Sequence, residues 1–325
     1  MANGDDIGGY FSLELPTNNA TFLNSDGVLL NSGRNALEYI IGCISTIKCL
    51  WIPYYTCNVI MEPIRKTGIF YRYYHINEQL EIAEDLQLLP DEYLLITNYY
   101  GVKDQYVNSL IQKYGDRLIV DNAQAYYSLP VDGIKTFYSP RKFVGVPDGG
   151  IAYVDHELDL AMYEKDLSYD RCEYLLKRID LGSEEGYLDC KASNRKLSNQ
   201  PIKKMSDLTQ KILESIDWER IKTIRLKNFE ILNTALSETN NLFISSAKTF
   251  ACPMIYPYFT SNPMLKNKLI ENRIWVATYW PHVISKCKEQ DFEYKLTEQM
   301  VAIPMDQRYN EIDMERIINV IMENI

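Results

Sequence analysis

Apolar positions follow two different spacings through the first half of the chain. Short continuous apolar runs are typical of buried strands. They are separated by stretches with apolar residues three or four positions apart, which are typical of helices. This alternation predicts a mainly parallel sheet flanked by helices. The predicted strands cover residues 49–53, 69–76, 93–97, 118–121, 134–137 and 150–154, and the predicted helices cover residues 35–44, 58–66 and 105–114.

The second half of the chain has a different pattern. Residues 156–237 are almost entirely helical in spacing, with a polar interruption over residues 182–200. Within them, residues 205–236 are expected to cross from a large domain to a small one. The remainder mixes strand-like pieces at 242–244 and 253–258 with helices at 264–272 and 314–324. We therefore predict a large domain over residues 1–215 and a small α+β domain over residues 216–325.

An acid and a lysine are the most informative polar residues. Asp121 ends the apolar run 118–120, and Lys142 follows 21 residues later, shortly before the pair Gly149-Gly150. Ligands of parallel sheets lie at the carboxyl ends of the strands, where Asp121 and Asn98 fall. An acid against a pyridine nitrogen keeps that nitrogen protonated, and a lysine amine forms a Schiff base with an aldehyde. Asp121 and Lys142 therefore predict the cofactor pyridoxal 5'-phosphate (PLP), with these two residues as the catalytic pair.

Each of these residues also has an ordinary structural explanation. Aspartates at strand ends are common in α/β proteins, and residues 139–142 fit a surface turn with two solvated cations. The combination of Asp-x-Ala-Gln, the spaced lysine and the Gly-Gly pair favours a cofactor site over a plain α/β protein without one.

A phosphate group needs N–H groups, hydroxyls or a cation at the start of a helix, because the helix dipole stabilises a dianion there. The turn Ser32-Gly33-Arg34-Asn35 opens the first long predicted helix and offers all three. The alternative is a simple helix cap by Ser32 or Asn35 with a surface arginine. With Asp121 and Lys142 downstream, the turn is predicted to bind the cofactor phosphate through Gly33, Arg34 and Asn35.

Composition and charge narrow the function classes. A chain of 325 residues with 46% hydrophobic residues can bury a large core. Its net charge is −10, and its 34 Lys and Arg are scattered among 44 acids, so neither nucleic acid nor an anionic membrane is an expected partner. An anionic substrate would need a local cationic pocket.

Cysteine spacing and the N-terminus exclude other classes. The seven cysteines form no CxxC pair, so we expect no metal site and no disulfide framework. The first residues contain no basic n-region, and no apolar run reaches the length of a membrane span. A cytoplasmic protein is expected.

Several segments resemble the DegT/DnrJ/EryC1/StrS aminotransferases, a branch of the fold type I PLP enzymes. The resemblance covers nearly the whole chain. It rests on Asp121-Asn122-Ala123-Gln124-Ala125, the Lys142 and Gly149-Gly150 spacing, Ser32-Gly33-Arg34-Asn35-Ala36-Leu37, residues 51–57, Arg225 with Asn228, Ile303-Pro304, Tyr309 and Asp313.

This resemblance implies both a fold and an activity. The implied fold is α/β, with a mainly parallel seven-stranded sheet in the large domain and a smaller C-terminal α+β domain. The implied enzyme is an aminotransferase that moves an amino group from glutamate or glutamine to a nucleotide-linked keto-sugar, in a homodimer with shared active sites. Relatives that dehydrate sugars replace the lysine with histidine, so Lys142 favours transamination. Other PLP chemistry and a catalytically silent binding protein on the same scaffold remain as alternatives.

The resemblance also implies roles for single residues. Lys142 would exchange its Schiff base with the amino acid donor and then move a proton as general base and acid. Gln124 would lie beside the 3-hydroxyl or the face of the ring. Tyr55 or Tyr100 would stack on the ring, because Cys57 occupies the position where many relatives have an aromatic residue. The complete predicted cofactor set is Gly33, Arg34, Asn35, Tyr55, Asn98, Asp121, Gln124, Ser139 and Lys142.

Some positions depart from the family pattern. The family usually has a serine five residues before its lysine, where this chain has Phe137, so Ser139 or Thr136 is expected to reach the phosphate. Lys204 stands where relatives carry an arginine that reaches a neighbouring active site, and it would keep the charge without the bidentate geometry. Residues 9–11, Gly-Tyr-Phe, are a candidate contact for the acceptor.

Overall fold

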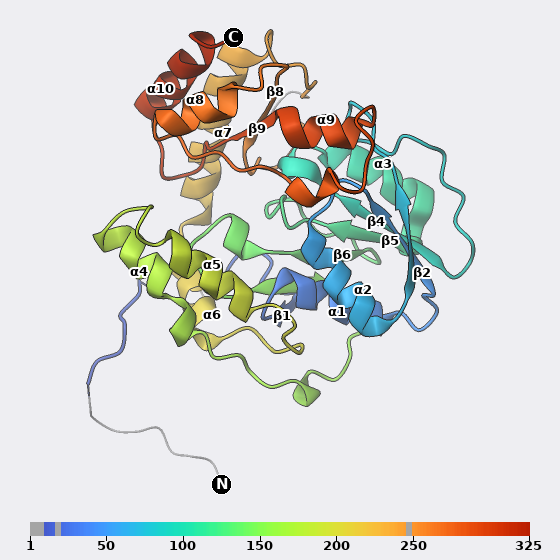
Figure 1. The fold of residues 1–325 in the computed structure, drawn as a ribbon. Helices are drawn as coiled ribbons and strands as arrows, with labels where there is room; N and C mark the ends of the chain where they lie inside the picture. The colour runs from blue at the N-terminus through green and yellow to red at the C-terminus, as the bar shows by residue number, and fades with distance from the viewer. Residues whose placement is uncertain (1–9, 17–20, 245–248) are drawn as a thin grey trace.

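A computed structural model describes residues 10–16, 21–244 and 249–325. Its main element is a seven-stranded sheet with the strand order β1-β7-β6-β5-β4-β2-β3 (Figure 1). The strands from β6 to β3 run parallel, whereas β7 is antiparallel to both β6 and β1. The strands are β1 (Val28–Leu30), β2 (Cys49–Pro53), β3 (Phe70–Tyr74), β4 (Glu92–Thr97), β5 (Leu118–Asp121), β6 (Lys135–Tyr138) and β7 (Gly150–Tyr153).

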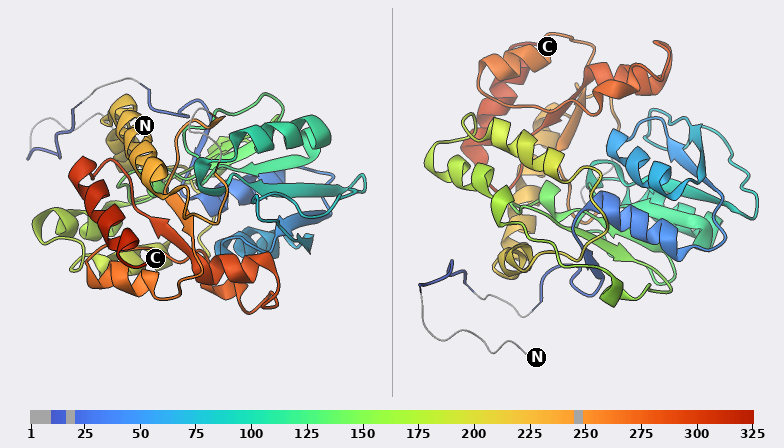
Figure 2. Two further views of the ribbon diagram at one scale, coloured as in Figure 1. Left: turned by 90° about the horizontal axis from the view of Figure 1, so that it is seen from above. Right: turned by 60° about the horizontal axis from the view of Figure 1, so that its bottom comes forward.

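Helices cover both faces of this sheet (Figure 2). Helices α1 (Gly33–Cys43) and α2 (Met61–Thr67) share one apolar cluster with Ile119 and with alternate residues of the other strands. Helix α3 (Asp104–Tyr114) belongs to a second cluster, which includes Val120. Because side chains of a strand alternate between faces, Asp121 points to the same face as Ile119, where α1 packs.

The C-terminal part of the chain adds a two-stranded antiparallel sheet of β8 (Tyr256–Phe259) and β9 (Met300–Ile303). Helix α7 (Trp218–Leu236) extends from the neighbourhood of the large sheet to α10 (Glu311–Met322), as Figure 1 shows. The other helices are α4 (Glu173–Asp180), α5 (Tyr187–Lys196), α6 (Asp207–Glu214), α8 (Leu265–Glu271) and α9 (Phe292–Gln299).

The expected α/β fold with a seven-stranded sheet is confirmed. The six strands placed from the apolar pattern are β2 to β7, and the three helices placed in the same half are α1, α2 and α3. The predicted domain division after residue 215 falls between α6 and α7. The apolar cluster beside α3 continues across that point as far as Ile321, so the domain division stays a prediction.

Three expectations for the second half are wrong. The polar interruption over residues 182–200 contains α5, in which only Ser193 is buried, so the helix has no apolar stripe to reveal it. Residues 156–172 form short turns instead of a helix. The segment 205–236, which has helical spacing, is divided into α6 and α7, because Asp217 caps α7 by accepting from the Arg220 N–H. Residues 242–244 form no strand, and Phe243 is exposed.

Candidate active site

Lys142 lies in a tight turn after β6. Pro140 starts this turn, and its carbonyl accepts from the N–H groups of Phe143 at 2.9 Å and Val144 at 3.0 Å. Proline fits the first position of a helical turn because its φ is fixed and no N–H is needed there. The Lys142 side chain is exposed and lines a cavity of about 360 Å³.

The pair Gly149-Gly150 joins this turn to the start of α1. Gly149 has a left-handed φ of 123°, and a methyl group on it would lie 2.8 Å from Pro140 Cγ. A methyl group on Gly150 would lie 2.2 Å from both the carbonyl carbon and the oxygen of Ser32. Only glycine permits such close approach of two backbone segments. The pair therefore brings the lysine turn and the turn at residues 32–33 together.

The turn at the start of α1 faces Ser139. A methyl group on Gly33 would lie 3.4 Å from Ser139 Cβ and 3.8 Å from its Oγ, so a narrow gap separates the two segments. Ser32 caps the helix, and its Oγ accepts from the Asn35 N–H at 3.2 Å. The Asn35 side chain is buried and donates to the Gln200 carbonyl at 3.0 Å. The structure thus brings Gly33, Asn35 and Ser139 to one place.

Arg34 points elsewhere. Its guanidinium forms an ion pair with Glu62 of α2 at 3.1 Å and donates to Ser198 at 3.0 Å. The side chain is 11% exposed in this arrangement. Arg34 therefore has protein partners for its charge, and its predicted contact with a phosphate stays a prediction.

Asp121 is a buried carboxylate at the end of β5. Its Oδ1 accepts from the Ala123 N–H at 2.9 Å. Burial raises the pKa of Asp121, and the positive charge of Lys142 and the Ala123 hydrogen bond oppose that rise. Lys142 is therefore close enough for its charge to act on Asp121. Lys142 lines the cavity of about 360 Å³ and Asp121 does not, so a shared cofactor site for the two residues stays a prediction.

Polar groups near this acid lack partners among the described residues. Gln124 accepts from the Tyr100 N–H through Oε1 at 2.8 Å, but its buried Nε2 has no hydrogen-bond partner in residues 10–16, 21–244 and 249–325. Thr97 pairs in register with Asp121, and its buried hydroxyl also has no hydrogen-bond partner among the described residues. Unpaired buried polar groups are costly, so these two atoms suit a bound polar ligand.

Two predicted residues are engaged by neighbouring side chains. Tyr55 is fully buried, its hydroxyl bonds that of Tyr100 at 2.8 Å, and its ring centroid lies 4.8 Å from that of Trp280. The Asn98 amide donates to Asp104 at 2.7 Å and lines a separate cavity of about 300 Å³. Ring stacking by Tyr55 or Tyr100 and cofactor contact by Asn98 stay predictions.

The cavity beside Lys142 is cationic. It is lined by five cations and one acid, and that acid, Asp306, forms an ion pair with Arg308 at 2.6 Å. In a chain with a net charge of −10, such a concentration of positive charge favours an anionic ligand. The five cations are Arg141, Lys142, Arg178, Arg225 and Arg308.

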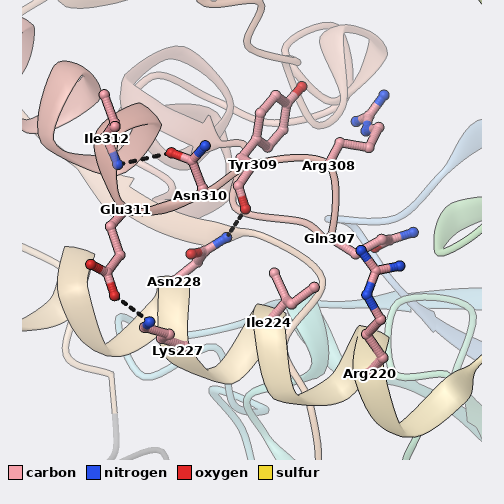
Figure 3. Close-up of a pocket in the computed structure, with 10 residues that line it drawn as sticks. All are labelled: Arg220, Ile224, Lys227, Asn228, Gln307, Arg308, Tyr309, Asn310, Glu311 and Ile312. Atoms are coloured by element: carbon pink, nitrogen blue, oxygen red, sulfur yellow. Dashed lines mark hydrogen bonds and ion pairs between the residues drawn. The ribbon is translucent and has the colours of Figure 1, made fainter.

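A larger cavity of about 510 Å³ lies between α7 and residues 307–312 (Figure 3). Its lining residues include Lys227, which is ion-paired with Glu311, and Asn228, which donates to the Tyr309 carbonyl at 3.0 Å. Neither Asp121 nor Lys142 lines it. Because size without reactive groups does not define an active site, we place the candidate site at Lys142.

Two further sequence candidates do not line the cavity beside Lys142. Lys204 forms backbone bridges with Leu30 of β1 and with Lys165, at the edge of the sheet. Tyr10 and Phe11 are 98% and 93% exposed, and Gly9 lies outside the described residues. Whether Lys204 reaches a second subunit and whether residues 9–11 contact an acceptor stay predictions.

Thr97 and Gln307 are candidate-site residues that sequence reasoning missed. The position of Thr97, one residue before Asn98 at the end of a predicted strand, was the available signal. Gln307 follows β9, and no local pattern marks it.

Comparison of the sequence with known proteins gives no match to any family model and none to any curated protein. Comparison of the structure gives clear matches. They include DesV from S. venezuelae, with a TM-score of 0.64, 15% identity and coverage of 91% of this chain and 84% of that one. A DegT DnrJ EryC1 StrS aminotransferase from Brucella abortus has a TM-score of 0.59, 13% identity and coverage of 91% and 85%. The Bacillus subtilis protein ntda, solved with bound cofactor PMP, has a TM-score of 0.64, 15% identity and coverage of 91% and 72%.

The chain thus shares the α/β fold of the DegT/DnrJ/EryC1/StrS aminotransferases and of the fold type I PLP enzymes, as the resemblance implied. No helix in the described ranges is long and apolar enough to cross a membrane. In the same part of the chain, no group of three or more His, Cys, Asp and Glu side chains could hold a metal ion.

Proposed function

We propose that this protein is a PLP-dependent aminotransferase that moves an amino group from glutamate or glutamine to a keto-sugar, which we expect to be nucleotide-linked. The observation that carries the proposal is the convergence of three features. A buried carboxylate ends β5, a lysine lies within reach of its charge, and the start of α1 faces Ser139 across a narrow gap.

The residues present fit a phosphorylated pyridine. The Asp121 carboxylate accepts a hydrogen bond from the Ala123 N–H, and a protonated ring nitrogen would add a cationic donor. The unpaired Nε2 of Gln124 would donate to a ring oxygen. The gap between Gly33 and Ser139, at the N-terminus of an 11-residue helix, suits a phosphate dianion.

Within this site each side chain has a distinct task. The cofactor, when bound, supplies an aldehyde and an electron-withdrawing ring. Asp121 would hold the proton on the ring nitrogen, and Lys142 Nζ would take the proton from Cα of the amino acid donor and deliver it to the cofactor carbon that carried the aldehyde. Ser139 and the N–H groups at the start of α1 hold the phosphate in place.

The cationic cavity supports an anionic substrate. Arg178 and Lys142 are exposed within it, and they can meet the carboxylate of an amino acid or the phosphates of a nucleotide. We further propose a homodimer in which Lys204 of one subunit approaches the active site of the other. Sedimentation of the purified protein would test the dimer.

Absorption spectroscopy tests the proposal. The protein loaded with PLP should show a visible band that shifts when glutamate is added, and Lys142→Ala should lose that band while remaining folded. Lys113→Ala, at an exposed ion pair with Asp85, is the matched control and should behave as the wild type. A screen of nucleotide-linked keto-sugars against the glutamate-treated enzyme then identifies the acceptor.

Each failure has a distinct meaning. If the band is present but glutamate does not shift it, the protein binds the cofactor and does not catalyse transamination. A Lys142→Ala variant with full activity would show that another residue is the nucleophile, and no band at all would contradict the cofactor assignment.

A further inference from the structure

Arg225 is a buried guanidinium outside the proposed catalytic pair. It is 2% exposed, and none of the ion pairs found in the described residues involves it. Burial lowers the pKa of Arg225, and the nearby Asp306 carboxylate opposes the shift. A buried cation without a direct carboxylate partner depends on hydrogen bonds to stay in place. The groups that accept hydrogen bonds from Arg225 therefore show which segments this side chain holds together.

The donors of Arg225 reach three separate segments. Its Nη2 donates to the Phe143 carbonyl at 3.3 Å, and its Nη1 donates to the Met254 carbonyl at 2.9 Å, just before β8. Its Nε donates to Gln307 Oε1 at 2.9 Å, just after β9. One side chain of α7 thus ties the lysine turn to both strands of the small sheet, at the end where Tyr256 pairs with Ile303.

Gln307 completes the contact with the lysine turn. Its Nε2 donates to the same Phe143 carbonyl at 2.8 Å, while its Oε1 accepts from Arg225. The Phe143 ring lies under the guanidinium, with Arg225 Cζ 4.7 Å from the ring centroid. Phe143 directly follows Lys142 in the chain. Because both Arg225 and Gln307 donate to the Phe143 carbonyl, this carbonyl is held from two sides. We call this contact the Phe143 clamp.

The clamp is itself anchored. Asn228, on the same helix as Arg225, donates to the Tyr309 carbonyl at 3.0 Å (Figure 3). It also donates to the Met305 carbonyl at 3.2 Å, so its bonds lie on either side of Gln307. The Met254 N–H donates to the Tyr100 carbonyl at 2.7 Å, and the Tyr100 N–H reaches Gln124. The small sheet is therefore connected to the lysine turn and to the Gln124 loop.

From this geometry we infer that Arg225 and Gln307 are positioning residues, which fix the backbone beside Lys142 and couple its placement to the C-terminal sheet. The inference rests on the proposed function for the role of Lys142. An arginine is required at this position, because a lysine has no planar fork with which to bond several carbonyls at once. An amide is required at Gln307, because it must accept from Arg225 and donate to Phe143.

Gln307→Glu tests the clamp. Glutamate keeps the acceptor for Arg225 and gives it an opposite charge, but it removes the donor to the Phe143 carbonyl. Asn240→Asp is the matched control, because it keeps the acceptor and removes the donor to a backbone carbonyl, that of Pro257 in β8, without touching the lysine turn.

Two measurements are made on each variant. Hydrogen exchange of the cofactor-free protein reports on the Phe143 and Val144 amides, and we expect Gln307→Glu to accelerate them about fivefold. With PLP bound, the rate of the spectral change at saturating glutamate should fall on the order of 10- to 100-fold, with little change in the glutamate concentration at half-maximum. Asn240→Asp should accelerate exchange near residues 240–242 and 257–259 but not at Phe143, and it should leave the glutamate rate near that of the wild type.

The inference is overturned if Gln307→Glu changes neither the exchange of the Phe143 and Val144 amides nor the glutamate rate, or if Asn240→Asp changes both equally. Should Gln307→Glu fail to fold, Gln307→Met, which removes the donor without adding a charge, is measured against the same criteria. A wild type that does not respond to glutamate would contradict the proposed function. The exchange comparison alone would then decide on the clamp.

Discussion

Gly33→Ala tests whether the gap between α1 and Ser139 holds a phosphate. The added methyl group would lie 3.4 Å from Ser139 Cβ and 3.8 Å from Ser139 Oγ, which are ordinary contact distances. Neither Gly33 nor Gly42 has a left-handed backbone, so alanine suits the helix at both positions. The fold should therefore tolerate the change and gain up to about 1 kcal/mol of helix stability.

Cofactor affinity should respond in the opposite direction. A phosphate oxygen must approach Ser139 Oγ to about 2.8 Å, and the methyl group occupies the space on that side. Losing one hydrogen bond to a charged group costs about 1.5–3 kcal/mol, which corresponds to roughly a 10- to 100-fold rise in the dissociation constant for PLP.

Gly42→Ala provides the control. Gly42 lies in the same helix, and a methyl group there would touch only Leu158 Cδ1 at 3.5 Å. Dissociation constants come from PLP titrations followed by absorbance, and fold stability comes from thermal unfolding of the cofactor-free proteins. If Gly33→Ala binds PLP as tightly as Gly42→Ala does, the phosphate does not lie between Gly33 and Ser139.

Three further predictions follow from the same site. The raised pKa of Asp121 means that folding favours its protonated form, so its contribution to stability is present at low pH and lost as the pH rises through the folded pKa. Cofactor-free Asp121→Asn should therefore unfold at a higher temperature than the wild type at pH 8, and the difference should shrink toward about pH 4. With cofactor bound, its amino-transfer rate should fall. Equal melting temperatures at pH 8 would contradict the stability prediction. Gly150→Ala, whose methyl group meets the Ser32 backbone at 2.2 Å, should lose at least about 2 kcal/mol in urea unfolding, and an unchanged midpoint would refute the close approach. Arg34→Gln should change the PLP dissociation constant by less than about threefold, because Glu62 and Ser198 already hold the arginine. A rise of more than about tenfold in this constant would show that Arg34 binds the phosphate.

Local signals were sufficient for six of the seven strands of the sheet, β2 to β7. The run at residues 118–121 is buried at every position, so its apolar pattern marks β5 without help from neighbours. The Ser32 cap marks the start of α1, and the Gly149-Gly150 pair marks a place where backbones must touch. Each of these features depends on chemistry within a few residues of chain.

Features that depend on distant partners were not visible in the sequence. From its position at the start of a helix, Arg34 is predicted to bind a phosphate. Its ion pair with Glu62 of α2 is visible only in the fold. Strand β1 has three residues and exists because it pairs with β7, more than 100 residues away. Gln307 reaches the lysine turn across 164 residues. Helix α5 is solvated over almost its whole surface and therefore lacks an apolar stripe.

The most direct measurement is chemical mapping of the lysine that binds PLP. The protein is mixed with PLP, treated with borohydride to fix the lysine–cofactor bond, digested and analysed by mass spectrometry. The proposal predicts a label on Lys142 that Gly33→Ala weakens and Gly42→Ala does not. A label on another lysine, or no label at saturating PLP, would contradict the assignment of Lys142 and Asp121 to a pyridoxal site.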